Sequence, residues 1–152
     1  MSFSWEPFGR IRQDDPQPAA PESPAPPPAP TREPVRPAAL PFRPARGLAV
    51  LMCMDCRIDP LSALGLSLGD AVVLRNAGAT VSDDVLRSIQ LAHDALGVNA
   101  VHVIGHTDCA AHGRDDEAAA AEAEYGAERI SAVLPNLRVS SGLLDLATGQ
   151  VL

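Results

Sequence analysis

Three cysteines and one histidine are the residues of this sequence whose types and spacing could do chemistry. Cys53 and Cys56 form a Cys-x-x-Cys pair, and His106 and Cys109 form a His-x-x-Cys pair. Thiolate and imidazole groups are the ligands that Zn²⁺ prefers in tetrahedral protein sites. No secretory signal is visible at the start of the chain, so the cysteines are better explained as thiols or metal ligands than as a disulfide framework. The two pairs therefore predict a zinc site.

Two arrangements of this zinc site compete. In the first, all four side chains close around a structural metal. In the second, Cys53, His106 and Cys109 hold the metal, and a fourth position stays open for water. Asp55 and Arg57 stand beside that open position, and an acid–arginine pair next to metal ligands serves chemistry rather than folding. A small domain with apolar strands can also fold without a zinc staple, so we favour the open site.

Short apolar runs predict the strands that position these side chains. Residues 48–53, 71–74 and 100–104 are each typical of a buried strand in a parallel sheet. Cys53 closes the first run, and the His-x-x-Cys pair follows the third. Because the carboxyl ends of parallel strands line the ligand crevice of an open sheet, we expect the cysteines and the histidine to converge at one end of the sheet.

Helices are predicted between these strands. Ser82 can cap a helix that ends at Gly97, and four apolar residues recur on one face of it: Val85, Ile89, Ala92 and Leu96. A strand–helix–strand unit of this kind is right-handed. A second helix is predicted from 115 to about 133, and a last strand at 143–146 is followed by a turn. The fold class is thus α/β, a small and mainly parallel β-sheet flanked by helices.

The first 46 residues differ in composition from the rest. Twelve of the fifteen prolines lie between Pro16 and Pro44. Proline fixes φ and removes a backbone donor, so this stretch can form neither a helix nor a ladder. We expect residues 1–46 to be a disordered proline-rich tail and residues 47–152 to be the folded zinc domain.

Charge and hydropathy exclude several classes of partner. Residues 47–152 carry six arginines against fourteen acidic residues, a net charge of −8. An acidic domain argues against nucleic acid or an anionic membrane surface as the main partner. No run of 18 apolar residues predicts a membrane span, and residues 1–12 show no apolar signal segment. We therefore expect a cytoplasmic protein.

The motifs resemble those of a known enzyme family. Cys-x-Asp-x-Arg at residues 53–57, paired with His-x-x-Cys at residues 106–109, looks like the β-class carbonic anhydrases. Four further segments are similar to that family, the last two to its short bacterial branch in particular: residues 75–79, 96–98, 83–85 and 145–149. The resemblance covers residues 47–113 well and 142–150 loosely.

This resemblance implies a carbonic anhydrase, a zinc lyase that hydrates carbon dioxide to bicarbonate and a proton. Zn²⁺ would be bound by Cys53, His106 and Cys109, with water or hydroxide at the fourth position. Asp55 would accept a hydrogen bond from the zinc-bound hydroxide and orient it. Arg57 would hold Asp55 ionised and in place.

The resemblance also implies a place for the substrate and an assembly. Backbone groups near Gly78 are expected beside the substrate, since glycine lets the chain come close. A homodimer or higher homo-oligomer is expected, with the active site near the subunit interface. Two other functions stay open: hydrolysis of carbonyl sulfide or carbon disulfide at the same site, or a non-catalytic zinc-binding or redox-sensing relative. Cys56 stands where the family usually has serine or alanine, and an inert residue, a redox partner and a fourth zinc ligand are all open.

Other polar residues near these motifs receive lesser roles. We expect His102 to be a strand residue that is satisfied locally, His93 to be solvated on its helix, and His112 to be exposed rather than a proton relay. Asp108 lies between two predicted ligands, and we expect it to orient His106 or a backbone amide.

Overall fold

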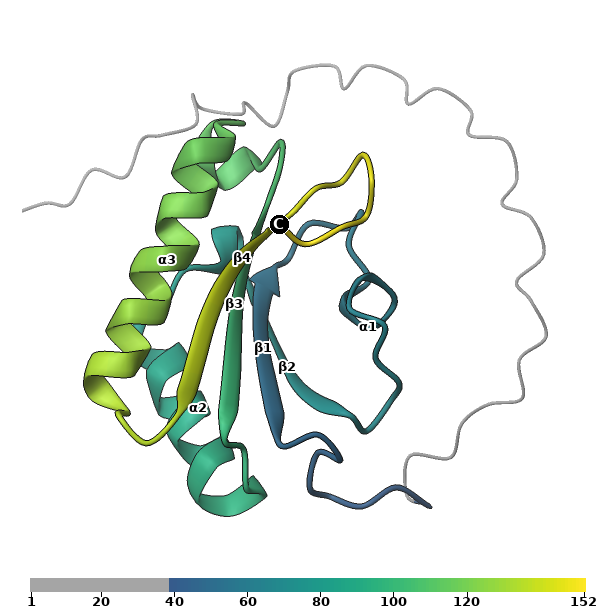
Figure 1. The fold of residues 1–152 in the computed structure, drawn as a ribbon, viewed down its shortest axis with the longest axis vertical. Helices are drawn as coiled ribbons and strands as arrows, with labels where there is room; N and C mark the ends of the chain where they lie inside the picture. Colours follow the sequence, from purple (N-terminus) through teal and green to yellow (C-terminus); the bar gives the residue numbers. More distant parts are fainter. Residues whose placement is uncertain (1–38) are drawn as a thin grey trace, which may run out of the picture. The chain divides into compact units, whose positions relative to one another are not determined.

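Four parallel strands form one sheet in the computed structural model, which describes residues 39–152. They are β1 (Leu48–Cys53), β2 (Ala71–Asn76), β3 (Ala100–His106) and β4 (Arg138–Leu144). Their spatial order is β2-β1-β3-β4, and each neighbouring pair is parallel (Figure 1). The predicted α/β fold class is confirmed, whereas the proline-rich tail lies outside the described residues up to residue 38.

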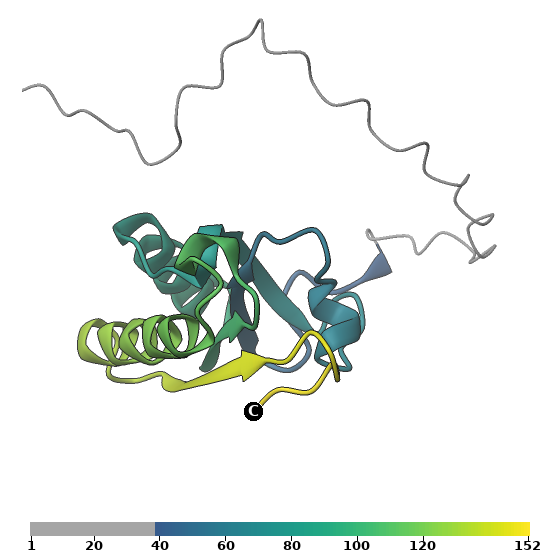
Figure 2. The same ribbon diagram turned by 90° about the horizontal axis from the view of Figure 1, so that it is seen from above.

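The path of the chain reverses direction across the sheet. It runs outward from β1 to β2, and then back past β1 to β3 and β4. Right-handed crossovers in opposite directions place their helices on opposite faces. Accordingly α1 (Pro60–Ala63) covers one face, while α2 (Asp83–Leu96) and α3 (Asp116–Val133) cover the other (Figure 1 and Figure 2). The carboxyl ends of β1 and β3 therefore form the switch point at which open sheets of this kind bind ligands.

The two long helices begin and end where the sequence predicts. The Ser82 hydroxyl accepts a hydrogen bond from the Val85 amide at 3.3 Å, and Gly97 ends α2 in the left-handed conformation. Asp115 caps α3 in the same way, because its carboxylate accepts from the Ala118 amide at 3.1 Å. Each cap satisfies a backbone donor that the first turn leaves free.

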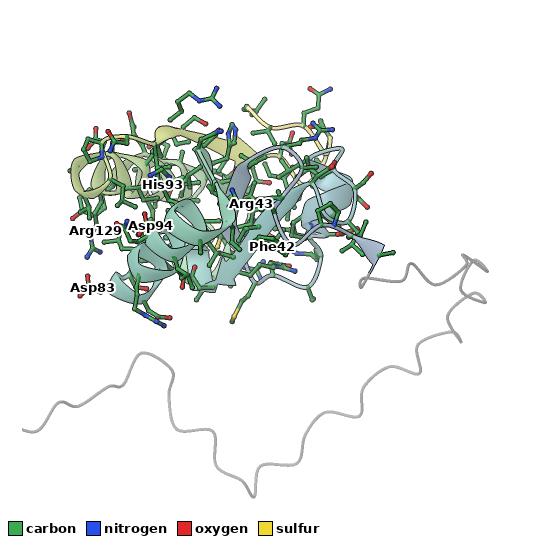
Figure 3. All side chains as sticks on the ribbon, turned by 90° about the horizontal axis from the view of Figure 1, so that it is seen from below. Phe42, Arg43, Asp83, His93, Asp94 and Arg129 are labelled. Carbon is green, nitrogen blue, oxygen red and sulfur yellow. The ribbon has the colours of Figure 1, made fainter. Side chains whose placement is uncertain are left out.

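Close contacts fix α3 against the sheet and against α2. A Cβ atom at Gly105 of β3 would lie 2.7 Å from the Ala119 carbonyl oxygen, so only glycine lets α3 approach this closely. On its other side, Arg129 of α3 pairs with Asp83 and donates to the Val81 carbonyl (Figure 3). The start of α2 and the middle of α3 are thereby joined.

The last strand begins earlier than the sequence indicates. The structure places β4 at Arg138–Leu144, and the expected strand at 143–146 runs into a turn instead. Asp145 stabilises this turn by accepting from the Ala147 amide at 2.8 Å, and Val151 then pairs antiparallel with Leu144. The sequence pattern misses the start of β4 because that segment is polar and largely exposed at the edge of the sheet.

Apolar side chains fill both faces of the sheet. The larger cluster lies between the sheet and the helices α2 and α3. A smaller cluster surrounds the carboxyl ends of β1 and β3 and has these buried members: Met52, Cys53, Ile58, Ile104, Cys109, Ala119 and Leu144. Two of the candidate ligands are therefore part of a rigid core. Within residues 39–152 no helix has the length and apolar character needed to cross a membrane, and the expected cytoplasmic location stays a prediction.

Candidate metal centre

Cys53, His106 and Cys109 converge at the switch point. Cys53 is the last residue of β1, His106 is the last residue of β3, and Cys109 follows in the next loop. Each offers one ligand atom, and these atoms lie within 4.8 Å of one another; the two Sγ atoms are 3.9 Å apart. All three side chains are buried. The parallel pairing of β1 with β3 thus brings together two motifs that are about fifty residues apart in the sequence.

One ring nitrogen of His106 is free to bind a metal. Nδ1 lies 2.9 Å from the Thr107 carbonyl oxygen. A carbonyl can only accept, so Nδ1 carries the proton and Nε2 keeps its lone pair. Nε2 is buried and has no hydrogen-bond partner within the described part of the chain. Buried polar atoms rarely lack a partner, and this orientation is the usual one for a metal-ligating histidine. Two thiols and one such imidazole fit Zn²⁺.

Cys56 lies outside the ligand group. Its side chain is exposed, and the group found among residues 39–152 contains only the other three candidates. Cys56 instead lines a cavity of about 320 Å³ next to Cys53 and Asp55. Three of the four predicted candidates therefore converge among the described residues, and Cys56 is not one of them.

Asp55 and Arg57 form a two-point ion pair beside the ligand atoms. The guanidinium donates from Nε to Oδ1 at 3.0 Å and from Nη2 to Oδ2 at 2.7 Å, and the Arg57 amide donates to Oδ1 at 2.9 Å. These hydrogen bonds hold the pKa of Asp55 far below its ordinary range and raise the pKa of Arg57. Asp55 Oδ2 is 3.9 Å from His106 Nε2, so this carboxylate borders the group of candidate ligand atoms.

Asp108 holds Arg57 rather than His106. Arg57 donates from Nη1 to Asp108 Oδ2 at 2.7 Å and from Nη2 to the Asp108 carbonyl at 3.1 Å. Hydrogen bonding to this guanidinium lowers the pKa of Asp108. The backbone of Asp108 has a positive φ of 56°, and its amide donates to Asp116 Oδ1 at 2.7 Å. Within the described residues the Asp108 carboxylate binds Arg57, and neither of the expected partners, His106 or a backbone amide, is among its hydrogen-bond partners.

The end of β2 and the segment after it contribute contacts that sequence reasoning left unassigned. Arg75 donates from Nε and Nη2 to the Cys53 carbonyl at 2.9 and 2.8 Å, and from Nη2 to the Asp55 carbonyl at 2.6 Å. The Gly78 amide donates to Cys53 Sγ at 3.4 Å. One sequence signal was available for these contacts: an arginine at the carboxyl end of a strand next to β1.

The other three histidines agree with expectation to different degrees. His102 lies in β3 as a strand residue, as expected, and its Nδ1 is 2.6 Å from the Ser140 hydroxyl of the neighbouring strand β4. His93 is not simply solvated: its Nδ1 lies 2.7 Å from the Val98 carbonyl, just beyond α2 (Figure 3). His112 is half-buried, with a hydrogen bond to the segment after β2, rather than exposed.

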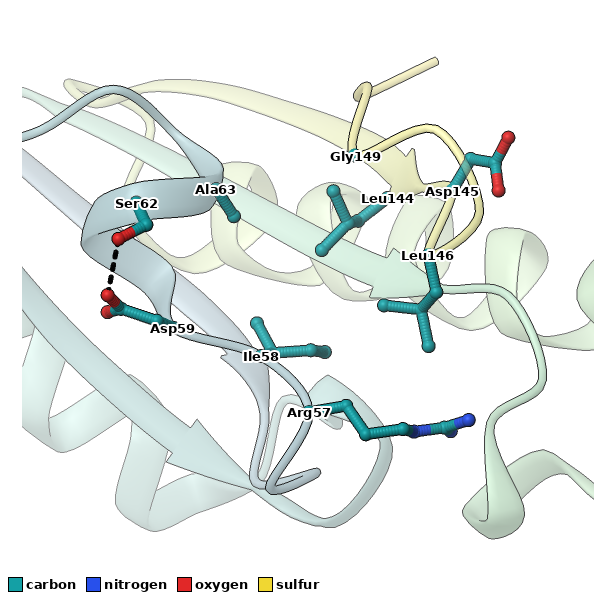
Figure 4. A pocket seen from close by; sticks show the side chains of 9 residues that line it. All are labelled: Arg57, Ile58, Asp59, Ser62, Ala63, Leu144, Asp145, Leu146 and Gly149. Atoms are coloured by element: carbon teal, nitrogen blue, oxygen red, sulfur yellow. Dashed lines mark hydrogen bonds between the residues drawn. The ribbon is translucent and has the colours of Figure 1, made fainter. Parts of the chain in front are cut away.

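A second cavity of about 340 Å³ opens at the other end of Arg57 (Figure 4). Ile58 and Ala63 form one wall of this cavity, and Leu144 and Leu146 form another. None of the three candidate ligands lines it. We therefore place the chemistry in the cavity beside Cys53 and Asp55.

Comparison with known proteins shows the family. A family model described as carbonic anhydrase matches residues 48–145. Beta-carbonic anhydrase 1 of Mycobacterium tuberculosis is 43% identical over 70 residues, which cover 46% of this chain and 43% of that protein. A crystal structure of carbonic anhydrase from Streptococcus mutans superimposes with a TM-score of 0.62 at 32% identity, covering 74% of this chain and 84% of that one. The chain belongs to the β-class carbonic anhydrase family.

A second kind of relative is similar to a larger share of the chain. A carbon disulfide hydrolase of Saccharolobus solfataricus is 39% identical over 101 residues, which cover 63% of this chain and 50% of that protein. The chain spans about half the length of the curated relatives that it matches.

Proposed function

We propose that this chain binds Zn²⁺ through Cys53, His106 and Cys109 and catalyses the reversible hydration of carbon dioxide to bicarbonate and a proton. One observation carries the proposal: a buried histidine Nε2 without a partner lies among two thiols and beside an ionised carboxylate. When bound, Zn²⁺ supplies the acidity that turns water into a nucleophile near neutral pH.

The ion pair would prepare that nucleophile. Two thiolates donate more charge to a metal than imidazoles do, which weakens its acidity and makes a nearby acceptor useful. Asp55 stays ionised because Arg57 holds it, so its carboxylate accepts a hydrogen bond from the attacking water and fixes the direction of its lone pair. Asp55 and Arg57 are the catalytic residues of this proposal.

Small apolar side chains would receive the substrate. Ala77, Ala110 and Ala111 line the cavity beside Cys53 and Asp55. Carbon dioxide is linear and apolar, so such walls suit it better than polar ones would. Gly78 follows the cavity-lining residue Ala77, and its amide donates to Cys53 Sγ, so we assign Gly78 to the substrate-binding segment.

Hydrolysis of carbon disulfide or carbonyl sulfide is the second candidate function. The similarity to a carbon disulfide hydrolase over 63% of the chain favours it. Both substrates are linear triatomic molecules, and the same ligands and the same ion pair would serve. The choice between them depends on the shape of the cavity. A zinc-binding relative without turnover is the remaining alternative, and the intact Asp55–Arg57 pair argues against it.

We also propose that the chain forms at least a homodimer. β2 lies at an open edge of the sheet, and apolar side chains are exposed within it and just before it, at Val73 and Leu68. Uncovered edges of parallel sheets are uncommon, since they offer free backbone groups to any other strand. A second copy of the chain would cover this edge.

Stopped-flow measurement of carbon dioxide hydration tests the main proposal. The zinc-loaded protein should show hydration whose rate rises from about pH 6.5 to 9, as more of the nucleophile is deprotonated. Cys53→Ala and Cys109→Ala should each lose the metal and the activity, whereas the matched control Cys56→Ala should keep both. Stoichiometric zinc in the first two variants would refute the assigned site. Release of sulfide from carbon disulfide, without hydration of carbon dioxide, would favour the second candidate.

A further inference from the structure

His112 is a half-buried residue that the proposed chemistry does not use. It lies at the end of the short helix η3 (Ala110–His112), three residues after Cys109. Its Nε2 is 3.1 Å from the Gly78 carbonyl oxygen. Because the carbonyl can only accept, Nε2 carries the proton and donates it, which fixes the tautomer of the ring. His112 thus joins the loop after β3 to the loop after β2.

Gly78 is clamped between this ring and a candidate metal ligand. It lies in the short helix η2 (Ala77–Ala79) with φ 72° and ψ 9°, a backbone conformation that favours glycine. A Cβ atom at this position would be 2.6 Å from His112 Nε2 and 3.1 Å from the Ala111 Cβ. On its other side, the Gly78 amide donates to Cys53 Sγ at 3.4 Å. The His112 ring therefore restricts the position of Gly78, whose N–H donates to the Cys53 sulfur.

We propose that His112 is a positioning residue that keeps the Gly78 N–H on the Cys53 sulfur and thereby tunes the bound metal. The inference rests on the metal site proposed above. A hydrogen bond to a thiolate withdraws charge from the sulfur, so the thiolate donates less charge to its metal. Without this bond Cys53 would be the stronger donor, and the metal would be the weaker Lewis acid.

A proton-relay role for His112 fits the geometry less well. Nε2 is engaged by the Gly78 carbonyl, and His112 is not among the residues that line the cavity beside Cys53 and Asp55. A relay needs a ring that exchanges protons between the reacting water and solvent. The observed contacts instead hold a backbone turn in place.

Absorption spectroscopy of the Co²⁺-loaded protein tests this role independently of turnover. The wild type should show a charge-transfer band from thiolate to cobalt. His112→Asn is too short to reach the Gly78 carbonyl, so its band should move to longer wavelength, as expected for a stronger thiolate donor. His112→Gln keeps an N–H donor at a similar reach and should restore the wild-type band. His102→Asn, a histidine on β3 away from the ligands, serves as the matched control and should leave the band unchanged.

The outcomes separate the inference from the metal site itself. A wild type without a thiolate-to-cobalt band would overturn the site and the inference together. A normal wild-type band that His112→Asn leaves unmoved would overturn the inference alone. Equal shifts in the Asn and Gln variants would also overturn it, because the Gln donor would then be irrelevant. Far-ultraviolet circular dichroism of each variant confirms that only folded protein is compared.

Discussion

The charge on Asp55 is set by its neighbours rather than by burial. Arg57 donates to it from the side chain and from the backbone, and Asp108 holds the same guanidinium from the other side. The three residues therefore form one chain of charge-assisted hydrogen bonds that joins the loop after β1 to the loop after β3. Such chains are expected to respond to mutation as a unit rather than additively.

Asp55→Asn tests what this charge does. The amide has nearly the same shape but is neutral and a poorer acceptor, so the variant should keep its zinc and lose about 10²-fold or more of the hydration rate. Stopped-flow rates and metal analysis on the same samples measure both quantities. Equal rates in wild type and variant would show that the ion pair serves structure only.

Asp108→Ala tests whether Arg57 depends on its second partner. Loss of the Asp108 carboxylate leaves Arg57 freer to turn into solvent, because its guanidinium is already 46% exposed. We expect about a 10-fold lower hydration rate with unchanged zinc content. In an Arg57→Ala background the same change should cost almost nothing further. Additive losses in the double variant would mean that Asp108 acts by another route.

The convergence of the three candidate ligands was predictable from sequence, whereas the contacts that support them were not. Cys53, His106 and Cys109 stand at the ends of apolar runs, and parallel strands bring such ends together. Arg75 reaches from β2 to the Cys53 and Asp55 carbonyls, and His112 reaches from η3 to the loop after β2. The conformation of the loops depends on positive φ angles at neighbouring residues. No local sequence pattern indicates which loops will lie next to each other in the fold.

At the scale of helices and strands, apolar periodicity correctly predicted buried residues where they recur on one regular face of an element. The helix α2 has its cap, its end and its buried residues where the sequence indicates. The start of β4 was not predicted because a polar edge strand lacks that pattern. The helix α1 was not predicted because four residues form only a single turn. Capping Ser, Asp and Gly residues thus predicted the ends of helices reliably only where a long apolar face supported the helix.

Gly105→Ala tests the close approach of α3 to β3. The added methyl would meet the Ala119 backbone carbonyl at 2.7 Å, and a helix backbone cannot move aside as a side chain can. We expect the free energy of unfolding to fall by about 1–3 kcal/mol, as measured by chemical denaturation of the metal-loaded protein. Gly126→Ala is the control: its methyl would meet the Val81 Cγ2 side-chain atom at 2.8 Å, and the gain in helix propensity offsets part of the cost. A larger loss at Gly126 than at Gly105 would contradict this account.

At the scale of the molecule, the described residues contain a core of their own. Both apolar clusters are built from residues beyond 48, and the segment before β1 is held by its own contacts, from the Ala45 amide to the Gly69 carbonyl and from Arg46 to Asp70. Deleting residues 1–38 should therefore leave the melting temperature and the zinc content nearly unchanged. A marked drop in either, against the full chain in the same buffer, would show that the first 38 residues belong to the folded unit.

The open edge at β2 is where the proposed homodimer can be tested. Val73 is 38% exposed on this edge strand, and a lysine there would place a charge where a second copy is expected to dock. Sedimentation velocity at micromolar concentration should show a dimer or larger species for the wild type and a shift toward monomer for Val73→Lys. Leu91→Lys is the matched control, because Leu91 is 61% exposed on α2, away from the edge, and its replacement should leave the assembly unchanged. A stable wild-type monomer would remove the homodimer proposal, and a dimer that only Leu91→Lys disrupts would move the interface from the sheet edge to the helical face.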